Sequence, residues 1–528
     1  MGGIGRSGCG GVETRGTWTL ELSLEACAGR VLWCGFGEEP GEDPTTYTSH
    51  ARFIVEELGA GGVILFTRNI GEFSSVRALN DAIHSGASQP PLIGIDQEGG
   101  RVCRIVSPGM VFPGNMALGS LDTPRLTHQV ARSLAGQLRA LGFDLNFAPS
   151  VDVNNNADNP VIGVRSFGSD PALVGRHGVA AIQGFLAGGV IPVAKHFPGH
   201  GNTSVDSHLA LPVQRESPAQ LQQLEWAPFR RAIVAGAPVV MSSHILFAEL
   251  DPELPATLSG KVLTDILRGK LGFNGVVVTD CLEMRAIADR WPPEQVAPLA
   301  IAAGADALLV CHTRATQIRM RDALMNAVRT GTLPEARLRE AAERVTLLQR
   351  HAAGLGHRPA LGAVSHRLSR SLERSAMDQA IGRLPGAEGR FGPCRLWHVT
   401  GCEEPAHALV ERLGRLHQAA RYAPCRADTL ASIPDHERIV LLAEPGRPFA
   451  RGKTDPDILD ALSGCSGSVV VSLREPYLLA DYPSDLVRIA AWGSRSLHIG
   501  AIARALTGLR EQELRELPAL PVIQSTRV

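Results

Sequence analysis

One segment of the sequence gathers an unusual density of side chains that can transfer protons. From Lys195 to His208 it reads KHFPGHGNTSVDSH, with three histidines, a lysine and an aspartate. Asp206 and His208 are two positions apart, so a tight loop would let the carboxylate orient the imidazole as a general acid or base. For any single histidine, the alternative is a loop held by ordinary side-chain hydrogen bonds. The absence of an H-E-x-x-H motif and the Gly- and Pro-rich setting disfavour a metal site.

Two further carboxylates end apolar runs. Asp280 closes VVVTD and is placed to act as a nucleophile at an electrophilic carbon, or else as the N-cap of the segment after it. Asp96 stands in IDQEGGRVCR, where a carboxylate that ends a buried run needs a polar ligand or an ionic partner. An internal Asp–Arg pair that braces the loop is the alternative for Asp96.

A fourth polar stretch, DVNNNADNPVIGVRSF at residues 152–167, is rich in turn-forming residues. Its Arg165 offers a planar set of donors that suits sugar hydroxyls or a carboxylate. A surface salt bridge is the alternative for this arginine.

The elements that must position these clusters alternate between short apolar runs and stretches of helical spacing. Near-continuous apolar strands are typical of a parallel sheet covered on both faces. Eight strand–helix units over roughly 300 residues predict a (β/α)8 barrel of the TIM type, with a doubly wound open sheet as the alternative. The eight runs are Val31–Phe36, Gly62–Phe66, Leu92–Asp96, Leu145–Ala148, Val190–Ala194, Val239–Ser242, Val276–Asp280 and Ala307–Cys311.

The pattern changes after the barrel. A helix-rich stretch is expected from about residue 334 to 384, and a second α/β pattern restarts after Pro385-Gly386. We therefore predict an α/β protein, with a (β/α)8 barrel followed by a smaller α/β layered domain. The expected bounds are an N-terminal tail at 1–23, the catalytic barrel at 24–355, a helical linker at 356–385 and a C-terminal domain at 386–528. Strands in the second domain are expected at Leu396–Thr400, Ile439–Ala443, Val469–Leu473 and Val487–Trp492.

Composition narrows the function classes. The 528 residues include 52 Lys and Arg against 53 Asp and Glu, so no strong net field favours nucleic acid or an anionic membrane. No apolar run reaches the ~18 residues of a membrane span, and no apolar segment at the N-terminus suggests a secretory signal. The ten cysteines form no C-x-x-C pair, which leaves a zinc ribbon or a thioredoxin-type site unsupported. We expect a cytoplasmic protein; its oligomeric state is not predicted.

Taken together and in this order, the four clusters resemble family 3 glycoside hydrolases. The resemblance is to the β-N-acetylglucosaminidase (β-N-acetylhexosaminidase) branch, which has a His/Asp acid–base dyad and trims cell-wall muropeptides or chitin fragments. It spans roughly residues 24–350, and the matching strings are IDQEGGRV, NPVIGVRSFG, KHFPGHGNTSVDSH, PATLSGKVLTDILRGKLGFNG and GVVVTDCLEM.

The resemblance implies a role for each residue. Asp280 would be the nucleophile of a retaining exo-hydrolase, and His208, paired with Asp206, would be the acid/base. The substrate would be a carbohydrate with N-acetylglucosamine at its non-reducing end, and no metal or cofactor would be required. The sugar's hydroxyls would be held by Asp96, Arg104, Arg165, Lys195 and His196.

Cys281 departs from the family pattern, because relatives often carry an acidic or a small residue beside the nucleophile. Three other functions stay open at this point: a family 3 β-glucosidase or β-xylosidase, a β-N-acetylglucosaminide phosphorylase, and an inactive carbohydrate-binding barrel.

Overall fold

The computed structural model describes residues 22–106, 111–355, 358–363, 367–383 and most of 397–508. Within the last range it leaves out residues 402, 417, 424, 427–428, 431, 435–437, 443–455, 464–467, 474–475, 484–485 and 493–494. Nearly all of the predicted N-terminal tail and the predicted break at Pro385-Gly386 lie outside the described residues.

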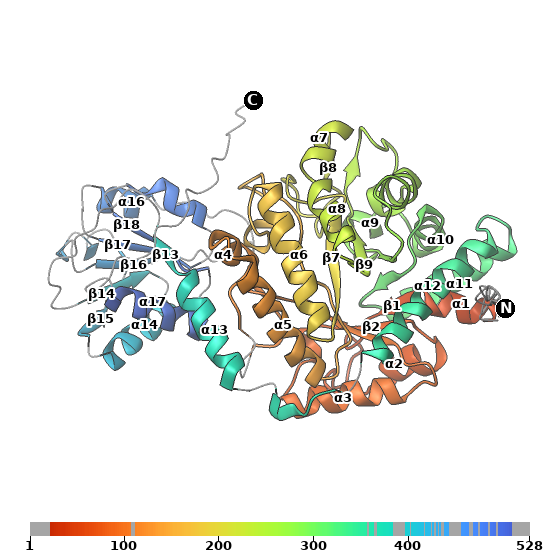
Figure 1. Ribbon diagram of the computed structural model, residues 1–528, viewed down its shortest axis with the longest axis horizontal. Coiled ribbons are helices and arrows are strands. Elements are labelled where there is room, and N and C mark those ends of the chain that lie inside the picture. The colour runs from red at the N-terminus through yellow and green to blue at the C-terminus, as the bar shows by residue number, and fades with distance from the viewer. Residues whose placement is uncertain are drawn as a thin grey trace, which may run out of the picture.

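Eight parallel strands form a barrel in the first part of the chain (Figure 1). Neighbouring strands follow the order β11-β9-β7-β6-β3-β2-β1-β12, and a parallel bridge between Val278 and Ala307 joins the two ends of this sheet. The ring confirms the predicted barrel and rules out the open doubly wound sheet. Each predicted run overlaps one strand, and β7 continues beyond its predicted run, past Ala194 to Phe197. The strands are β1 Leu32–Cys34, β2 Gly62–Leu65, β3 Leu92–Ile95, β6 Leu145–Asn146, β7 Ile191–Phe197, β9 Val239–Ser242, β11 Val276–Val278 and β12 Leu308–Val310.

Side chains alternate between the two faces of the barrel wall, as the strand repeat requires. In β2, Val63 and Leu65 pack with the outer helices, whereas Ile64 joins a cluster with Phe147 and Leu309 inside the barrel. Both faces are therefore apolar, which explains why the strands read as continuous hydrophobic runs in the sequence.

Helices cover the outside of the barrel. Local signals set their starts: Asp170 accepts hydrogen bonds from the first backbone N–H groups of α6, and proline occupies the first turn of α5 and α6. The covering helices are α1 Leu24–Arg30, α2 Ser49–Arg52 with the π-helical η1 Phe53–Glu57, α3 Phe73–Ser85, α5 Pro124–Ala140, α6 Pro171–Ala187, α7 Pro218–Gln223, α8 Trp226–Val234, the π-helical η5 Lys261–Lys270, α10 Pro293–Ala303, α11 Arg314–Arg329 and α12 Glu335–Gly354.

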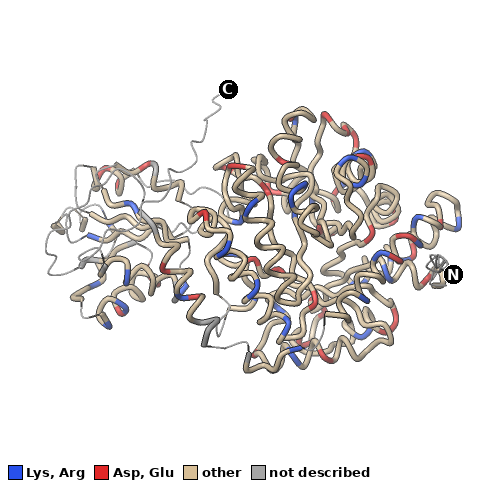
Figure 2. The backbone as a smooth tube through the Cα atoms, viewed as in Figure 1, with Lys and Arg blue, Asp and Glu red and all other residues tan. Residues whose placement is uncertain are grey.

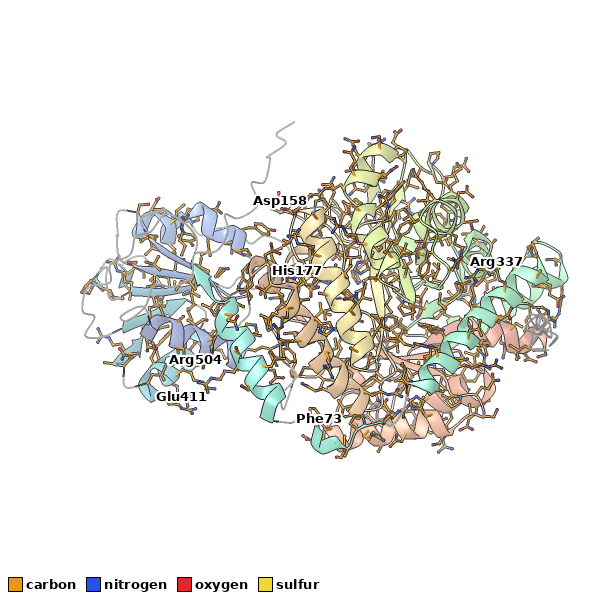
Figure 3. All side chains as sticks on the ribbon, in the orientation of Figure 1. Phe73, Asp158, His177, Arg337, Glu411 and Arg504 are labelled. Atoms are coloured by element: carbon orange, nitrogen blue, oxygen red, sulfur yellow. The ribbon has the colours of Figure 1, made fainter. Side chains whose placement is uncertain are left out.

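A second sheet of six strands lies beyond α13 (Figure 1). Its order is β13-β18-β17-β16-β14-β15, and every neighbouring pair is parallel except β13 with β18. In Figure 3, Arg504 of α17 lies beside α13, where its Nε donates to Asp378 at 2.8 Å. The elements are α13 Arg367–Ala380, β13 Gly382–Arg383, β14 Trp397–Gly401, α14 Glu403–Arg415, β15 Ala420–Tyr422, β16 Arg438–Leu442, α16 Pro456–Leu462, β17 Val469–Ser472, β18 Val487–Ala490 and α17 Ser496–Gly508.

The sequence prediction differs from the structure at two short strands of this second sheet. The stretch expected to be helical up to residue 384 ends instead in β13, which pairs antiparallel with β18. The three-residue β15 was also missed. Strands this short carry too few residues for a periodic pattern, so only the pairing partner reveals them.

The second domain packs against loops of the barrel. Met116 and Val164 of the barrel share an apolar cluster with Val440 and Val470 of the second sheet. The hydroxyl of Tyr477 accepts a hydrogen bond from the side-chain amide of Asn154 at 2.8 Å. These contacts brace the loop after β6, which also carries Arg165.

Charge is evenly distributed over both domains. Basic and acidic residues are interspersed along the described chain, in keeping with the near-zero net charge (Figure 2). Within the part of the chain that the structure describes, no helix is both long and apolar enough to cross a bilayer.

Candidate active site

A cavity of about 510 Å³ opens where the barrel strands reach their carboxyl ends. Its floor includes Ile64, Phe147, Met241 and Leu309, which belong to the apolar layer inside the barrel. Its walls are polar, and seven of the eight predicted site residues line it: Asp96, Arg104, Arg165, Lys195, His196, His208 and Asp280. The eighth, Asp206, is not among the lining residues but binds the imidazole of His208, which is.

Buried ion pairs tie one wall together. Glu98 accepts two hydrogen bonds from Arg165, at 3.1 and 2.8 Å, and lies 2.8 Å from Lys195 Nζ. Lys195 also donates to Asp96 at 2.9 Å, and Arg104 lies 3.4 Å from the same carboxylate. Burial works against ionisation of Glu98, but its two cationic neighbours lower its pKa to about 2. The wall therefore holds fixed charges of both signs within reach of a ligand.

A small hairpin after β3 positions Asp96, Glu98 and Arg104. Strands β4 Gln97–Gly99 and β5 Val102–Cys103 pair antiparallel. The side chain of Gln97 binds across the turn, accepting from the backbone N–H of Arg104 at 2.7 Å and donating to the carbonyl of Ile105 at 2.7 Å. This clamp fixes the positions of Asp96, Glu98 and Arg104 together. The internal Asp–Arg pair expected as the alternative for Asp96 is also present, because Asp96 pairs with Arg104 in the cavity wall.

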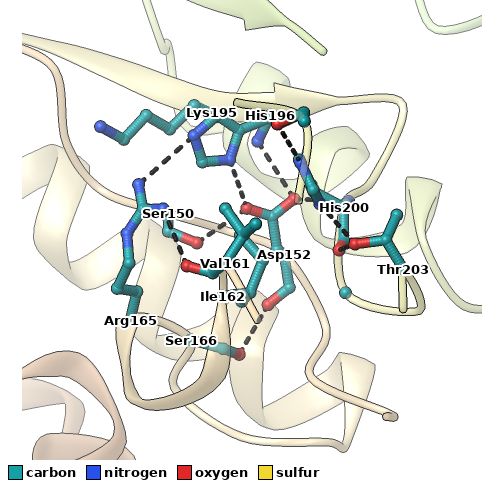
Figure 4. Close-up of polar contacts among 12 residues, drawn as sticks. Ser150, Asp152, Val161, Ile162, Arg165, Ser166, Lys195, His196, His200 and Thr203 are labelled. Carbon is teal, nitrogen blue, oxygen red and sulfur yellow. Dashed lines mark hydrogen bonds and ion pairs between the residues drawn. The ribbon is translucent and has the colours of Figure 1, made fainter. Parts of the chain in front are cut away.

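A second buried centre is built on Asp152 (Figure 4). This carboxylate lies 2.7 Å from Nδ1 of His196 and accepts from the backbone N–H of His196 at 3.1 Å and of His200 at 2.8 Å. Burial opposes the charge on Asp152, but the imidazole of His196 and these hydrogen bonds hold its pKa well below the usual range. Nε2 of His196 lies 3.4 Å from Arg165. Asp152 therefore orients the His196 ring, which lines the cavity.

The loop from His200 to His208 is pinned to the barrel at its base. The amide of Asn159 donates to the carbonyls of His200 and Gly201, both at 2.8 Å. Gly201 is required here, since a Cβ would come within 1.6 Å of the carbonyl oxygen of Val153. The three predicted histidines thus have separate partners, and the described residues contain no group of three or more His, Cys, Asp or Glu placed to hold a metal.

His208 lies at the rim of the cavity. Its Nδ1 is 2.8 Å from Asp206, and its backbone N–H donates to the same oxygen at 2.9 Å. The side chain of His208 is 62% exposed, whereas that of Asp206 is 23% exposed. With Nδ1 held by the carboxylate, Nε2 is left to exchange a proton with a group in the cavity.

Asp280 lies deep in the same cavity. The backbone N–H of Cys281 donates to its carboxylate at 2.7 Å. Burial raises its pKa, but His244, His196 and His208 nearby together bring the pKa below the ordinary value. Helix α9, Arg285–Ala288, begins with Met284 as its N-cap, so the N-cap alternative for Asp280 does not hold. Asp280 is thus an ionised carboxylate facing the cavity.

Sequence reasoning missed several polar residues of this site. Glu98 and Asp152 lie within the polar stretches already singled out, but their partners are far away in the chain. The cavity-lining Cys311 and His312 directly follow β12, and His244 follows β9. A polar residue just after a buried strand is the signal that would have found His244, Cys311 and His312.

The arrangement suits a hydroxyl-rich ligand. An ionised carboxylate at the base, a carboxylate-held imidazole at the rim and cationic donors on the wall can attack, protonate and orient such a molecule. The fold and the cavity define a (β/α)8-barrel enzyme. Residues 40–348 match the model of the glycosyl hydrolase family 3 N-terminal domain, and the chain belongs to that family.

Individual relatives agree with this assignment. The chain is 35% identical over 348 residues to beta-hexosaminidase A of Pseudoalteromonas piscicida, covering 60% of this chain and 58% of that protein. It is 37% identical over 278 residues to a beta-hexosaminidase of Alkalilimnicola ehrlichii, covering 52% of this chain and 79% of that one. A solved family 3 beta-N-acetylglucosaminidase from Paenibacillus sp. str. FPU-7 superimposes with a TM-score of 0.83 at 32% identity, covering 95% of this chain and 98% of that chain.

Proposed function

We propose that this protein is a retaining exo-β-N-acetylglucosaminidase that works through a covalent glycosyl-aspartate intermediate. The coarser assignment, β-N-acetylhexosaminidase, is supported by family membership and by the names of the relatives. The observation that carries the finer proposal is that Asp280 and the Asp206–His208 pair face one cavity from separate loops.

In the first half of the reaction, a carboxylate oxygen of Asp280 attacks the anomeric carbon of the terminal sugar. His208 gives its proton to the departing glycosidic oxygen, while Asp206 holds the imidazole in place. The lowered pKa of Asp280 keeps the nucleophile ionised.

In the second half, His208 takes a proton from water, which then attacks the glycosyl-aspartate. Two inversions at one carbon leave its configuration unchanged. An imidazole takes the place of the second carboxyl in the usual retaining pair, and it can both donate and accept a proton near neutral pH.

The shape of the cavity supports cleavage at a chain end. The apolar barrel interior closes its floor, so a sugar enters from the rim and goes no further. Arg165, Lys195, His196, Asp96 and Arg104 are assigned to the sugar's hydroxyls, since their polar atoms line the wall above that floor. The substrate class is therefore a carbohydrate ending in N-acetylglucosamine, such as a muropeptide or a chitin fragment.

A panel of aryl glycosides tests the proposal. The N-acetylglucosaminide should be cleaved far faster than the glucoside and the xyloside, with or without phosphate, and NMR should show the β-anomer of the product first. Preference for the glucoside or xyloside would refute the substrate, a sugar phosphate would indicate the phosphorylase, and no turnover at all would favour the binding protein.

The nucleophile is tested by Asp280→Asn with Asp289→Asn as its matched control. Asp289 carries the same side chain at the end of α9 and pairs with the exposed Arg285. We expect Asp280→Asn to lose activity by ~10⁴-fold or more with an unchanged melting temperature, and Asp289→Asn to keep wild-type activity. Retained activity in Asp280→Asn would refute the mechanism.

The cytoplasmic location predicted from the sequence stays a prediction. Fractionation of the source cells, followed by detection of the protein in each fraction, tests it.

A further inference from the structure

Two cysteines lie side by side in the wall of the cavity. Cys281 directly follows the proposed nucleophile, and Cys311 directly follows the neighbouring strand β12. Beyond the bridge between Val278 and Ala307, the backbone N–H of Leu282 donates to the carbonyl of Leu309 at 2.9 Å. This register places the two cysteines at neighbouring strand ends within one apolar cluster, and both thiols are free.

The pair has the surroundings of a reactive thiol. His312 lines the same cavity as Cys281, and its Nδ1 lies 2.7 Å from Glu38. The order thiol, imidazole, carboxylate is that of an activated cysteine nucleophile. The neighbouring Cys311 and His312 lower the pKa of Cys281 despite its burial, and the proximity of Cys281 and Glu38 raises the pKa of His312 to about 9. Glycoside cleavage as proposed above uses neither thiol nor His312.

The backbone of Cys281 connects this pair to the nucleophile. Its N–H donates to Asp280 at 2.7 Å, and its carbonyl accepts from Nε2 of His244 at 2.9 Å. Any covalent bond formed at Cys281 Sγ will shift the residue that holds Asp280 in position.

We propose that Cys281 and Cys311 form a peroxide-reactive dithiol that closes to a disulfide and thereby switches off the adjacent catalytic site. The Cys281 thiolate attacks the terminal oxygen of a hydroperoxide and the O–O bond breaks. The attacked oxygen stays on sulfur, so Cys281 becomes a sulfenic acid, and the other oxygen takes up a proton and leaves as water or an alcohol. The Cys311 sulfur then attacks the Cys281 sulfur, the S–O bond breaks, and the hydroxyl leaves as water with the Cys311 proton. Two thiols are oxidised and one peroxide is reduced, and an external dithiol reverses the change.

The chemistry and its consequence are measured separately. The full-length protein is treated with a small molar excess of hydrogen peroxide, and alkylated peptides are mapped by mass spectrometry under non-reducing conditions. We expect a cross-linked peptide pair containing residues 281 and 311. We also expect kcat/KM on the aryl N-acetylglucosaminide to fall by ~10-fold or more, because sub-ångström placement of a nucleophile matters this much, and dithiothreitol to restore it.

Variants make the outcome decisive. Cys311→Ser should leave Cys281 as a sulfenic acid that dimedone traps, and Cys281→Ser should resist inactivation relative to its own untreated form. Cys425→Ser is the matched control, because Cys425 is partly exposed in the second domain, and it should be inactivated like the wild type. Reduced peptides at both positions after treatment, or equal inactivation of Cys281→Ser and wild type, would overturn the proposal. The peptide map requires no turnover, so failure of the glycosidase assignment would be seen independently.

Discussion

Replacing Glu98 by glutamine should weaken both the fold and the site. The side chain of Glu98 is 2% exposed, and it bridges Arg165 and Lys195, whose side chains are 10% and 3% exposed. Glu98→Gln keeps the volume but removes the negative charge, so two buried cations lose their shared partner.

The size of the loss follows from the pKa of Glu98. Its fall from 4.5 to about 2 on folding corresponds to about 3 kcal/mol, at ~1.4 kcal/mol per pKa unit. Because the pKa is lowered in the folded protein, this stabilisation is fully present above about pH 4.5 and is lost as the pH falls through about 2. We expect Glu98→Gln to lower the free energy of unfolding by ~3 kcal/mol at pH 7, and the difference from wild type to shrink in acid.

Urea unfolding followed by tryptophan fluorescence measures this difference in the barrel, where Trp33 and Trp226 are buried. Glu294→Gln is the matched control: Glu294 makes a similar pair of bonds to Arg319, at 2.7 and 2.8 Å, but both side chains are 52% exposed. We expect little change in the control, because water screens an exposed pair. The same Glu98→Gln protein should show kcat/KM reduced by ~10- to 100-fold, since Arg165 and Lys195 each lose an ionic contact that positions them in the cavity wall. Equal stability losses in the two variants would refute this account of the buried pair.

Two further predictions concern the acid/base pair and the second domain. Asp206→Asn should reduce kcat by ~100-fold or more with little change in KM, because the imidazole of His208 loses the carboxylate that orients it. Steady-state kinetics measure both constants, and an unchanged circular dichroism spectrum shows that the variant is folded. A raised KM with a normal kcat would contradict this role. Tyr477→Phe should raise KM several-fold and lower the free energy of unfolding by ~1 kcal/mol, because it removes the hydrogen bond to Asn154 on the loop that carries Arg165. A wild-type KM in this variant would show that the second domain does not position the loop.

The sequence alone determined the features that depend on neighbouring residues. The barrel strands could be predicted because both faces of each strand are buried, so the apolar runs are nearly unbroken. Asp206 and His208 could be paired because they are two positions apart, and Asp280 stood out as a carboxylate at the end of an apolar run.

Only the tertiary structure decided the features that join distant parts of the chain. Closure of the sheet depends on the meeting of Val278 with Ala307, which no local pattern encodes. Glu98 is 67 positions from Arg165, so neither residue indicated the other until the hairpin after β3 and the loop after β6 converged. The contact of Cys281 with Cys311 likewise requires two adjacent strands to end side by side. Pairing across a closed barrel is set by strand register, and register is a property of the assembled sheet, because each segment taken alone satisfies several registers equally well.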